Sequence, residues 1–139
     1  MSGFLLDTNI VSELRKNDRA DARVRRWLDE HAAAEFWLSV LVVGELRRGI
    51  ELIRRRDALA VSALLVWLSS TIEDYTDRIL PVTVAISQRW ALISVPDPVP
   101  VVDGLLAATA IEHGLTLVTR HVDDVRCTGV AVVNPFSPD

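Results

Sequence analysis

The sequence predicts an α/β fold in which a mainly parallel sheet carries helices on both faces. Short apolar runs alternate with longer segments of helical periodicity along the whole chain, which is the pattern of parallel strands joined by crossover helices. The 139 residues, half of them apolar, are enough for one sizeable core and too few for two. No internal repeat or low-complexity stretch interrupts them, so we expect one domain over residues 1–139.

Five short apolar runs are the expected strands, because each is bounded by charged residues, turn residues or a helical pattern. They cover residues 4–6, 35–39, 78–82, 115–119 and 130–133. Six segments with apolar residues three and four positions apart are the expected helices. They cover residues 10–16, 20–34, 40–55, 57–70, 84–94 and 101–113. Ser39 is expected to cap the third helix, and Gly114 to end the last one.

Composition limits the classes of function. Cys127 is the only cysteine, which excludes an intrachain disulfide and a cysteine-rich metal site. No run approaches the roughly 18 apolar residues of a membrane span, and the start of the chain lacks the features of a secretion signal. We therefore expect a cytoplasmic protein without a membrane partner. A net charge of −4 also argues against a strongly basic nucleic-acid-binding surface.

Asp7 directly follows the first expected strand and is itself followed by Thr8 and Asn9. In parallel α/β sheets, ligands bind beyond the carboxyl ends of the strands, so these polar side chains point toward a potential binding crevice. The alternative is that Asp7 only caps the helix that begins near Asn9. The residues around Asp7 alone do not decide between the two.

Glu45 stands where a fully solvated residue is not expected, because it shares a largely apolar helical stripe with Leu41 and Leu52. An ion pair with Arg48, one turn later, would also explain it.

Asp103 falls in the first turn of the last expected helix, on the face of Leu106 and Ala110. The helix dipole alone also favours an acid there. Asp124 follows the fourth expected strand after a short step, beside Asp123, and acids are common in such turns.

The four acids Asp7, Glu45, Asp103 and Asp124 could meet at one end of the sheet. Carboxylates within a few ångströms of one another repel and raise each other's pKa unless a cation neutralises them. Oxygen ligands without histidine or cysteine suit a hard ion such as Mg²⁺ or Mn²⁺, which is often completed by substrate phosphate. This set supports metal-assisted hydrolysis of a phosphodiester bond.

The positive charges gather in clusters. Setting aside the four candidate acids leaves 15 of the 19 acidic residues, which equals the 15 Lys and Arg. The clusters could contact phosphates, although ordinary ion pairs on solvated helices explain each one as well. They are Arg15 with Lys16; Arg23, Arg25 and Arg26; Arg47 with Arg48; and Arg54, Arg55 and Arg56.

Four pieces occur in a fixed order: "LLDTNIVSEL", "SVLVVGELRRGIEL", "VVDGLLAATAIEHGLTLVTR" and the acid that follows. Each piece alone is weakly specific, but together they span almost the whole chain. In this order and spacing they resemble the VapC-type toxins of the PIN-domain ribonuclease family.

The resemblance implies a three-layer α/β/α domain that acts as the endoribonuclease toxin of a type II toxin–antitoxin pair. It implies an RNA substrate, Mg²⁺ or Mn²⁺ as cofactor, and a cognate antitoxin that lays a helix into a groove and through which alone DNA is contacted. The residues it assigns to metal binding and catalysis are Asp7, Glu45, Asp103 and Asp124, and those it assigns to support are Thr8, Asn9 and Thr119.

One stretch departs from the family pattern. Similar proteins read Thr-x-Asn-x-x-Asp-Phe around the fourth acid, whereas here "TRHVDDV" places His121 at the Asn and Val125 at the Phe. Asp124 keeps the family spacing, and Asp123 substitutes for it if the loop is shifted. His121 can donate a hydrogen bond to a carboxylate or act as a general base, and a loop histidine without a catalytic role is the alternative.

Other classes fit less well. A response-regulator receiver needs a lysine late in the chain, where the only lysine is Lys16, and a haloacid-dehalogenase-like phosphatase needs an acid where Asn9 stands. The remaining rival is a catalytically impaired PIN-like binding protein that works mainly in an antitoxin–DNA complex. The altered loop at His121 motivates it, and the intact acids argue against it.

The stretch "VSALLVWL", residues 61–68, carries more apolar surface than one helix must bury. This favours an antitoxin groove or a homodimer face, with core packing for most of its residues. We expect a homodimer.

Overall fold

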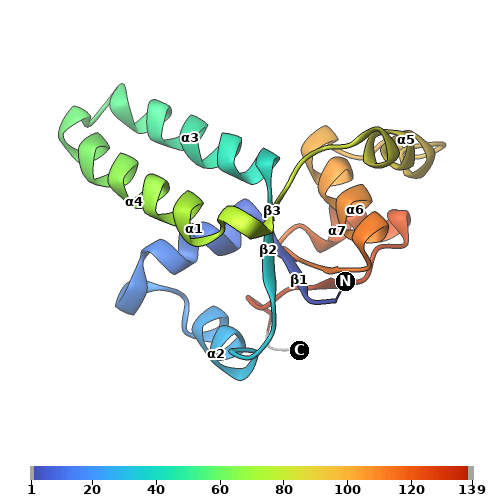
Figure 1. The fold of residues 1–139 in the computed structure, drawn as a ribbon, viewed down its shortest axis with the longest axis horizontal. Helices are drawn as coiled ribbons and strands as arrows, with labels where there is room; N and C mark the ends of the chain where they lie inside the picture. The colour runs from blue at the N-terminus through green and yellow to red at the C-terminus, as the bar shows by residue number, and fades with distance from the viewer. Residues whose placement is uncertain (1, 138–139) are drawn as a thin grey trace.

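The computed structural model describes residues 2–137 and shows a five-stranded parallel sheet between two layers of helices (Figure 1). The strand order is β3-β2-β1-β4-β5, and every neighbouring pair is parallel. The strands are β1 (Phe4–Leu6), β2 (Phe36–Ser39), β3 (Ile79–Leu80), β4 (Thr116–Val118) and β5 (Val132–Val133). The predicted α/β/α fold with a parallel sheet is confirmed.

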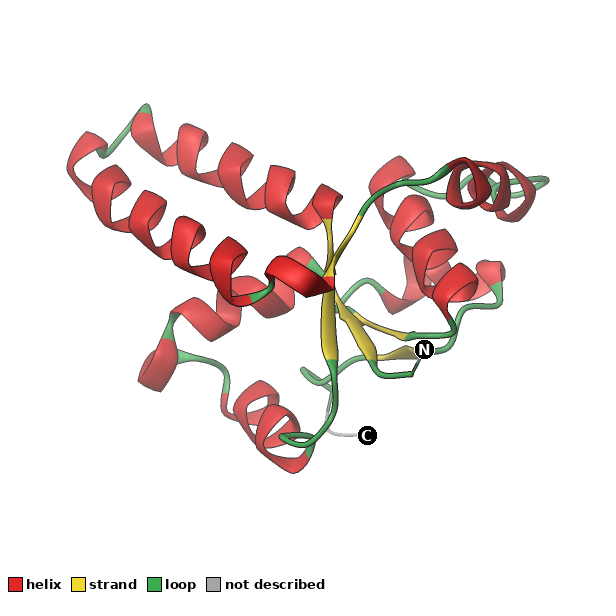
Figure 2. Cartoon of the chain, viewed as in Figure 1, coloured by secondary structure: helices red, strands yellow, loops and turns green. Residues whose placement is uncertain are grey.

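Helices join the strands (Figure 2). Those of the described residues are α1 (Thr8–Arg15), α2 (Ala22–Glu30), α3 (Val40–Arg54), α4 (Val61–Asp74), α5 (Val84–Ile93), α6 (Val101–His113) and α7 (Val122–Val125). Figure 1 shows the sheet nearly edge-on, with α1 to α4 on one side and α5 to α7 on the other. None of the helices in residues 2–137 is long and apolar enough to cross a membrane.

The predicted elements differ from the structure mainly at their ends. Helix α1 begins at Thr8, two residues before its predicted start, because the Asp7 side chain caps it by accepting a hydrogen bond from the Thr8 amide. Helix α2 begins only at Ala22, because Asp21 accepts hydrogen bonds from the amides of the first turn. Capping side chains therefore set both boundaries.

Two predicted caps are present. The Ser39 hydroxyl accepts a hydrogen bond from the Leu41 amide at 3.1 Å, at the start of α3. Gly114 ends α6 in the left-handed region, with a φ of +66°, which glycine adopts at little cost. These caps fix where the helices that carry Glu45 and Asp103 begin and end.

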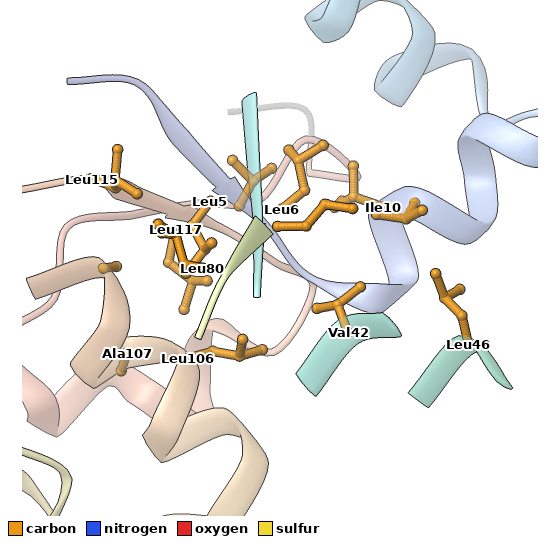
Figure 3. Close-up of a cluster of buried hydrophobic side chains, with 14 of the residues drawn as sticks. Leu5, Leu6, Ile10, Val42, Leu46, Leu80, Leu106, Ala107, Leu115 and Leu117 are labelled. Atoms are coloured by element: carbon orange, nitrogen blue, oxygen red, sulfur yellow. The ribbon is translucent and has the colours of Figure 1, made fainter. Parts of the chain in front are cut away.

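The hydrophobic core surrounds the central strands (Figure 3). Leu5 and Leu6 of β1 are fully buried, and Ile10 of α1, Val42 of α3 and Leu106 of α6 pack into the same cluster. The core therefore holds the carboxyl ends of the strands and three surrounding helices in fixed positions.

Candidate metal centre

Asp7 is the first residue after β1 and is only 3 % exposed. Its Oδ1 accepts a hydrogen bond from the Thr8 amide at 2.7 Å. Its Oδ2 accepts from the Thr119 hydroxyl at 2.7 Å and from the Asn9 side-chain amide at 3.2 Å. Asp7 thus caps α1, as the simpler interpretation predicts, and its carboxylate is also held in one orientation at the edge of the sheet.

Thr119 connects this carboxylate with the loop after β4. Its hydroxyl oxygen donates to Asp7 and accepts from the His121 amide at 2.9 Å. The Arg120 amide donates to Oδ1 of Asn9 at 3.3 Å. Because β1 and β4 are parallel neighbours in register, the polar residues that follow the two strands lie side by side.

Helix α6 brings Asp103 to the same place. Nδ1 of His121 lies 3.3 Å from Oδ1 of Asp103 and 3.9 Å from Oδ2 of Asp7. One ligand atom each of Asp7, Asp103 and His121 lies within 4.8 Å of the others, close enough to share one metal ion. These three residues form the acidic cluster. His121, predicted only as a hydrogen-bond donor or general base, is therefore also a candidate ligand.

Burial, one hydrogen bond and the neighbouring charges shift two pKa values in this cluster. Burial raises the pKa of Asp103, and the charges of Asp7 and Asp124 raise it further, against the lowering effect of the hydrogen bond with His121. Burial on its own lowers the pKa of His121, but the hydrogen bond with Asp103 and the charges of the three acids outweigh it and raise that pKa. A bound cation would relieve the repulsion between these carboxylates, so the donor set fits a metal ion.

Glu45 extends the cluster from α3. Its Oε1 accepts a hydrogen bond from the Thr8 hydroxyl at 2.6 Å, which links it to the residue next to Asp7. Glu45 is half-buried and lies outside the group within 4.8 Å. Within residues 2–137 it forms no ion pair with Arg48, so the alternative explanation by such a pair does not hold.

Two neighbouring acids of α7 behave differently. The Asp123 side chain is 88 % exposed and forms an ion pair with Arg126. Asp124 is exposed too, but its charge raises the pKa of both Asp103 and His121. Asp124 is therefore the acid whose charge reaches the cluster, although it lies outside the group within 4.8 Å.

A groove lies between α1, α3 and α4. It includes a cavity of about 160 Å³ whose lining contains Thr8, Glu45, Arg15 and Leu64. A second cavity of about 440 Å³ shares Arg15 and Leu64 with the first. Part of residues 61–68, namely Leu64, thus borders a cavity that Glu45 also lines.

Part of the positive charge is neutralised on the surface. Arg54 and Arg47 both pair with Glu51 and lower its pKa to about 2. Arg26 and Arg48, by contrast, form no ion pair with any residue between 2 and 137. The interpretation as ordinary ion pairs therefore accounts for only part of the arginines.

The family model described as PIN domain matches residues 4–123. The toxin FitB of Neisseria gonorrhoeae is 31 % identical over 96 % of this chain and 98 % of that protein. The VapC ribonuclease Y4jK of Sinorhizobium fredii is 28 % identical over 97 % of this chain and 99 % of that protein.

The chain is also similar in fold to solved structures. A structure of FitAB bound to an IR36 DNA fragment superposes with a TM-score of 0.83 at 29 % identity, covering 98 % of this chain and 97 % of that chain. DNA-bound VapBC from Salmonella typhimurium gives a TM-score of 0.74 at 21 % identity, over 97 % of this chain and 99 % of that one, a likeness of fold.

Proposed function

This chain belongs to the PIN-domain family, and on that premise we propose that it is a metal-dependent endoribonuclease, the toxin of a toxin–antitoxin pair. The observation that carries the proposal is the convergence of Asp7, Asp103 and His121 within 4.8 Å at the carboxyl edge of the sheet. A relative of nearly equal length is named a VapC ribonuclease, which supports the same activity. In this proposal residues 1–139 form one nuclease domain that works in the cytoplasm.

The proposed cofactor is Mg²⁺ or Mn²⁺. Its proposed ligands are carboxylates, which suit these hard ions, and they are Asp7, Glu45, Asp103 and Asp124. When bound, such an ion supplies a Lewis acid for the scissile phosphate and activates a water molecule for the attack.

The protein's own side chains orient the metal ligands and exchange protons. Thr119 and Asn9 orient the Asp7 carboxylate, and Thr8 orients Glu45. The His121 side chain is 47 % exposed, so it can exchange a proton with solvent beside Asp103. An RNA phosphate can reach the acids from that exposed side.

We assign the groove between α1, α3 and α4 to a cognate antitoxin. Glu45 is among its lining residues and part of the lining is apolar, so a docked helix could bury apolar residues and place a basic side chain beside Glu45. FitAB and VapBC were solved bound to DNA. By analogy, we propose that this protein contacts DNA only through its antitoxin and that it is a homodimer.

The test is cleavage of total cellular RNA by the purified chain with Mg²⁺, with Mn²⁺ and with EDTA. The variants Asp7→Asn and Asp103→Asn should abolish cleavage while keeping the fold, because asparagine has nearly the same shape as aspartate but is a poorer metal ligand. Discrete fragments that require both the metal and the two acids are the expected result.

A second candidate is a PIN-like binding protein with impaired catalysis, favoured by His121 standing inside the cluster. No cleavage by folded protein that binds Mn²⁺ would support it. The variant His121→Asn, which restores the family residue, should then gain activity.

A further inference from the structure

A cavity of about 350 Å³ lies between α2 and the segment that follows β5. This volume falls within the range of roughly 300–1,000 Å³ that small-ligand pockets show, so it can enclose a group of nucleotide size. Its lining includes Arg23, Arg26, Trp27 and Glu30 on α2, and Asn134 and Pro135 after β5.

The chemistry of the walls favours a negatively charged ligand. Arg26 has no ion pair among residues 2–137, and Arg23 lies 3.8 Å from its nearest acid, Asp21, with 53 % of its side chain exposed. Among the described residues that line the cavity, Glu30 is the only acid. Two arginines with free donors are suited to bidentate binding of a phosphate.

Trp27 adds a fixed aromatic wall. Its ring stacks on His31 at 4.3 Å between centroids and meets the edge of Phe4 at 4.9 Å. Such rings bind unstacked bases of single-stranded nucleic acids. Groups that are suited to binding a phosphate and a base therefore line one cavity.

The segment that lines one side of the cavity begins close to the acidic cluster. Strand β5 is parallel to β4, and the Thr119 amide donates to the Val133 carbonyl at 3.0 Å, so the residues after β5 start at the edge that carries Asp7. The Arg120 guanidinium lies 3.8 Å from the centroid of the Phe136 ring. Exposed Arg120 thus lies between the cluster and the segment that lines the cavity.

We propose that this cavity is a subsite for one nucleotide of a single-stranded RNA that passes over Arg120 from the acidic cluster. A phosphate binds between Arg23 and Arg26, and the base lies against Trp27. The proposal rests on the ribonuclease function proposed above and adds a substrate-binding site outside the metal centre. Duplex RNA is disfavoured because its bases are stacked away from such a wall.

Binding of a fluorescently labelled single-stranded RNA tests the subsite separately from cleavage. Affinity is measured against KCl concentration in EDTA, with Asp103→Asn as the background so that no cleavage occurs. Arg26→Ala and Arg23→Ala should each weaken binding and reduce the slope of log affinity against log salt, and the double variant should reduce that slope by about 0.7, the value for one phosphate contact on a single strand. Arg25→Ala is the matched control, because Arg25 is on the same helix but does not line the cavity.

The outcomes separate the two proposals. Unchanged slopes and affinities for both Arg26→Ala and Arg23→Ala, or losses equal to that of Arg25→Ala, overturn the subsite even if the wild-type chain cleaves RNA. A reduced slope confined to the two lining arginines supports the subsite even if the wild-type chain cleaves nothing. All three arginines are exposed, and circular dichroism checks that the variants fold.

Discussion

The Thr119 hydroxyl holds the Asp7 carboxylate through a hydrogen bond whose geometry is fixed by the backbone, since the His121 amide donates to the same oxygen. Thr119→Val keeps the shape of the side chain but removes this donor. We expect RNA cleavage and Mn²⁺ affinity to fall by about 10–100-fold, as for other groups that orient metal ligands. Thr119→Ser keeps the hydroxyl and should stay close to wild type. Equal losses in the two variants would show that Thr119 acts through packing alone.

Asp123 and Asp124 offer a paired comparison at neighbouring positions. Asp124→Asn should severely impair cleavage, because the charge of Asp124 reaches Asp103 and His121. Asp123→Asn should leave the rate nearly unchanged, because Asp123 pairs with Arg126 at the surface. Steady-state cleavage rates of both variants show which of the two acids is needed for cleavage. The reverse order would make Asp123 the fourth acid.

Sequence alone could place Asp7, Thr8 and Asn9 at a strand end, because the apolar run before them marks the strand. It could not place His121 beside Asp103, since that contact depends on how α6 packs against the loop after β4. The hydrogen bond from Thr8 to Glu45 likewise joins residues 37 positions apart and has no local signature.

At the scale of elements, Gly104 sets how closely α5 packs on the helix that carries Asp103. A methyl group at Gly104 would lie 3.0 Å from Cδ1 and 3.1 Å from Nε1 of Trp90, which is closer than ordinary contact. Gly104→Ala should therefore lower the free energy of unfolding by about 1–3 kcal/mol. Gly44→Ala on α3 meets nothing within 4 Å and should raise it by about 0.5–1 kcal/mol. Urea unfolding measures both, and a stable Gly104→Ala would mean that Trp90 moves aside freely.

Glu13 of α1 accepts a hydrogen bond from the amide of Asp21, which caps α2, and so connects the two helices. It is nearly buried, and although burial alone raises its pKa, hydrogen bonds from Lys16 and the Asp21 amide outweigh this and lower the pKa from 4.5. A lowered folded-state pKa stabilises the fold above pH 4.5, and this contribution is lost as the pH falls through the lowered value. The stability difference between wild type and Glu13→Gln should therefore be larger at pH 7 than at pH 3. Thermal unfolding at both pH values checks it, and an equal difference would contradict it.

The types of the elements followed from the sequence more reliably than their limits. Long periodic segments such as α3 and α6 were predicted almost to the residue, because apolar spacing and the caps Ser39 and Gly114 agree. The third strand was predicted over 78–82 but pairs only at Ile79–Leu80, because pairing with β2 sets its length. Helix α7 has four residues, too few for a periodic signal.

For the whole molecule, a metal that binds the cluster should stabilise the native fold, because the unfolded chain does not hold these acids together. At a hundredfold excess of Mn²⁺ over its dissociation constant we expect the Tm to rise by about 5–10 °C. The Asp7→Asn variant should show a much smaller rise at the same Mn²⁺ concentration. Differential scanning fluorimetry measures both, and equal rises would place the bound ion elsewhere.

The hydrogen bond between Thr119 and Asp7 spans 112 positions, and β1 is paired with β4 in the middle of the sheet. During synthesis, the first strand and Asp7 leave the ribosome long before the segment that completes their surroundings. A nascent or prematurely terminated chain therefore carries Asp7, Thr8 and Glu45 without a formed site. For the nuclease proposed above, the site therefore stays incomplete, and the protein inactive, until the segment that carries Thr119 has left the ribosome.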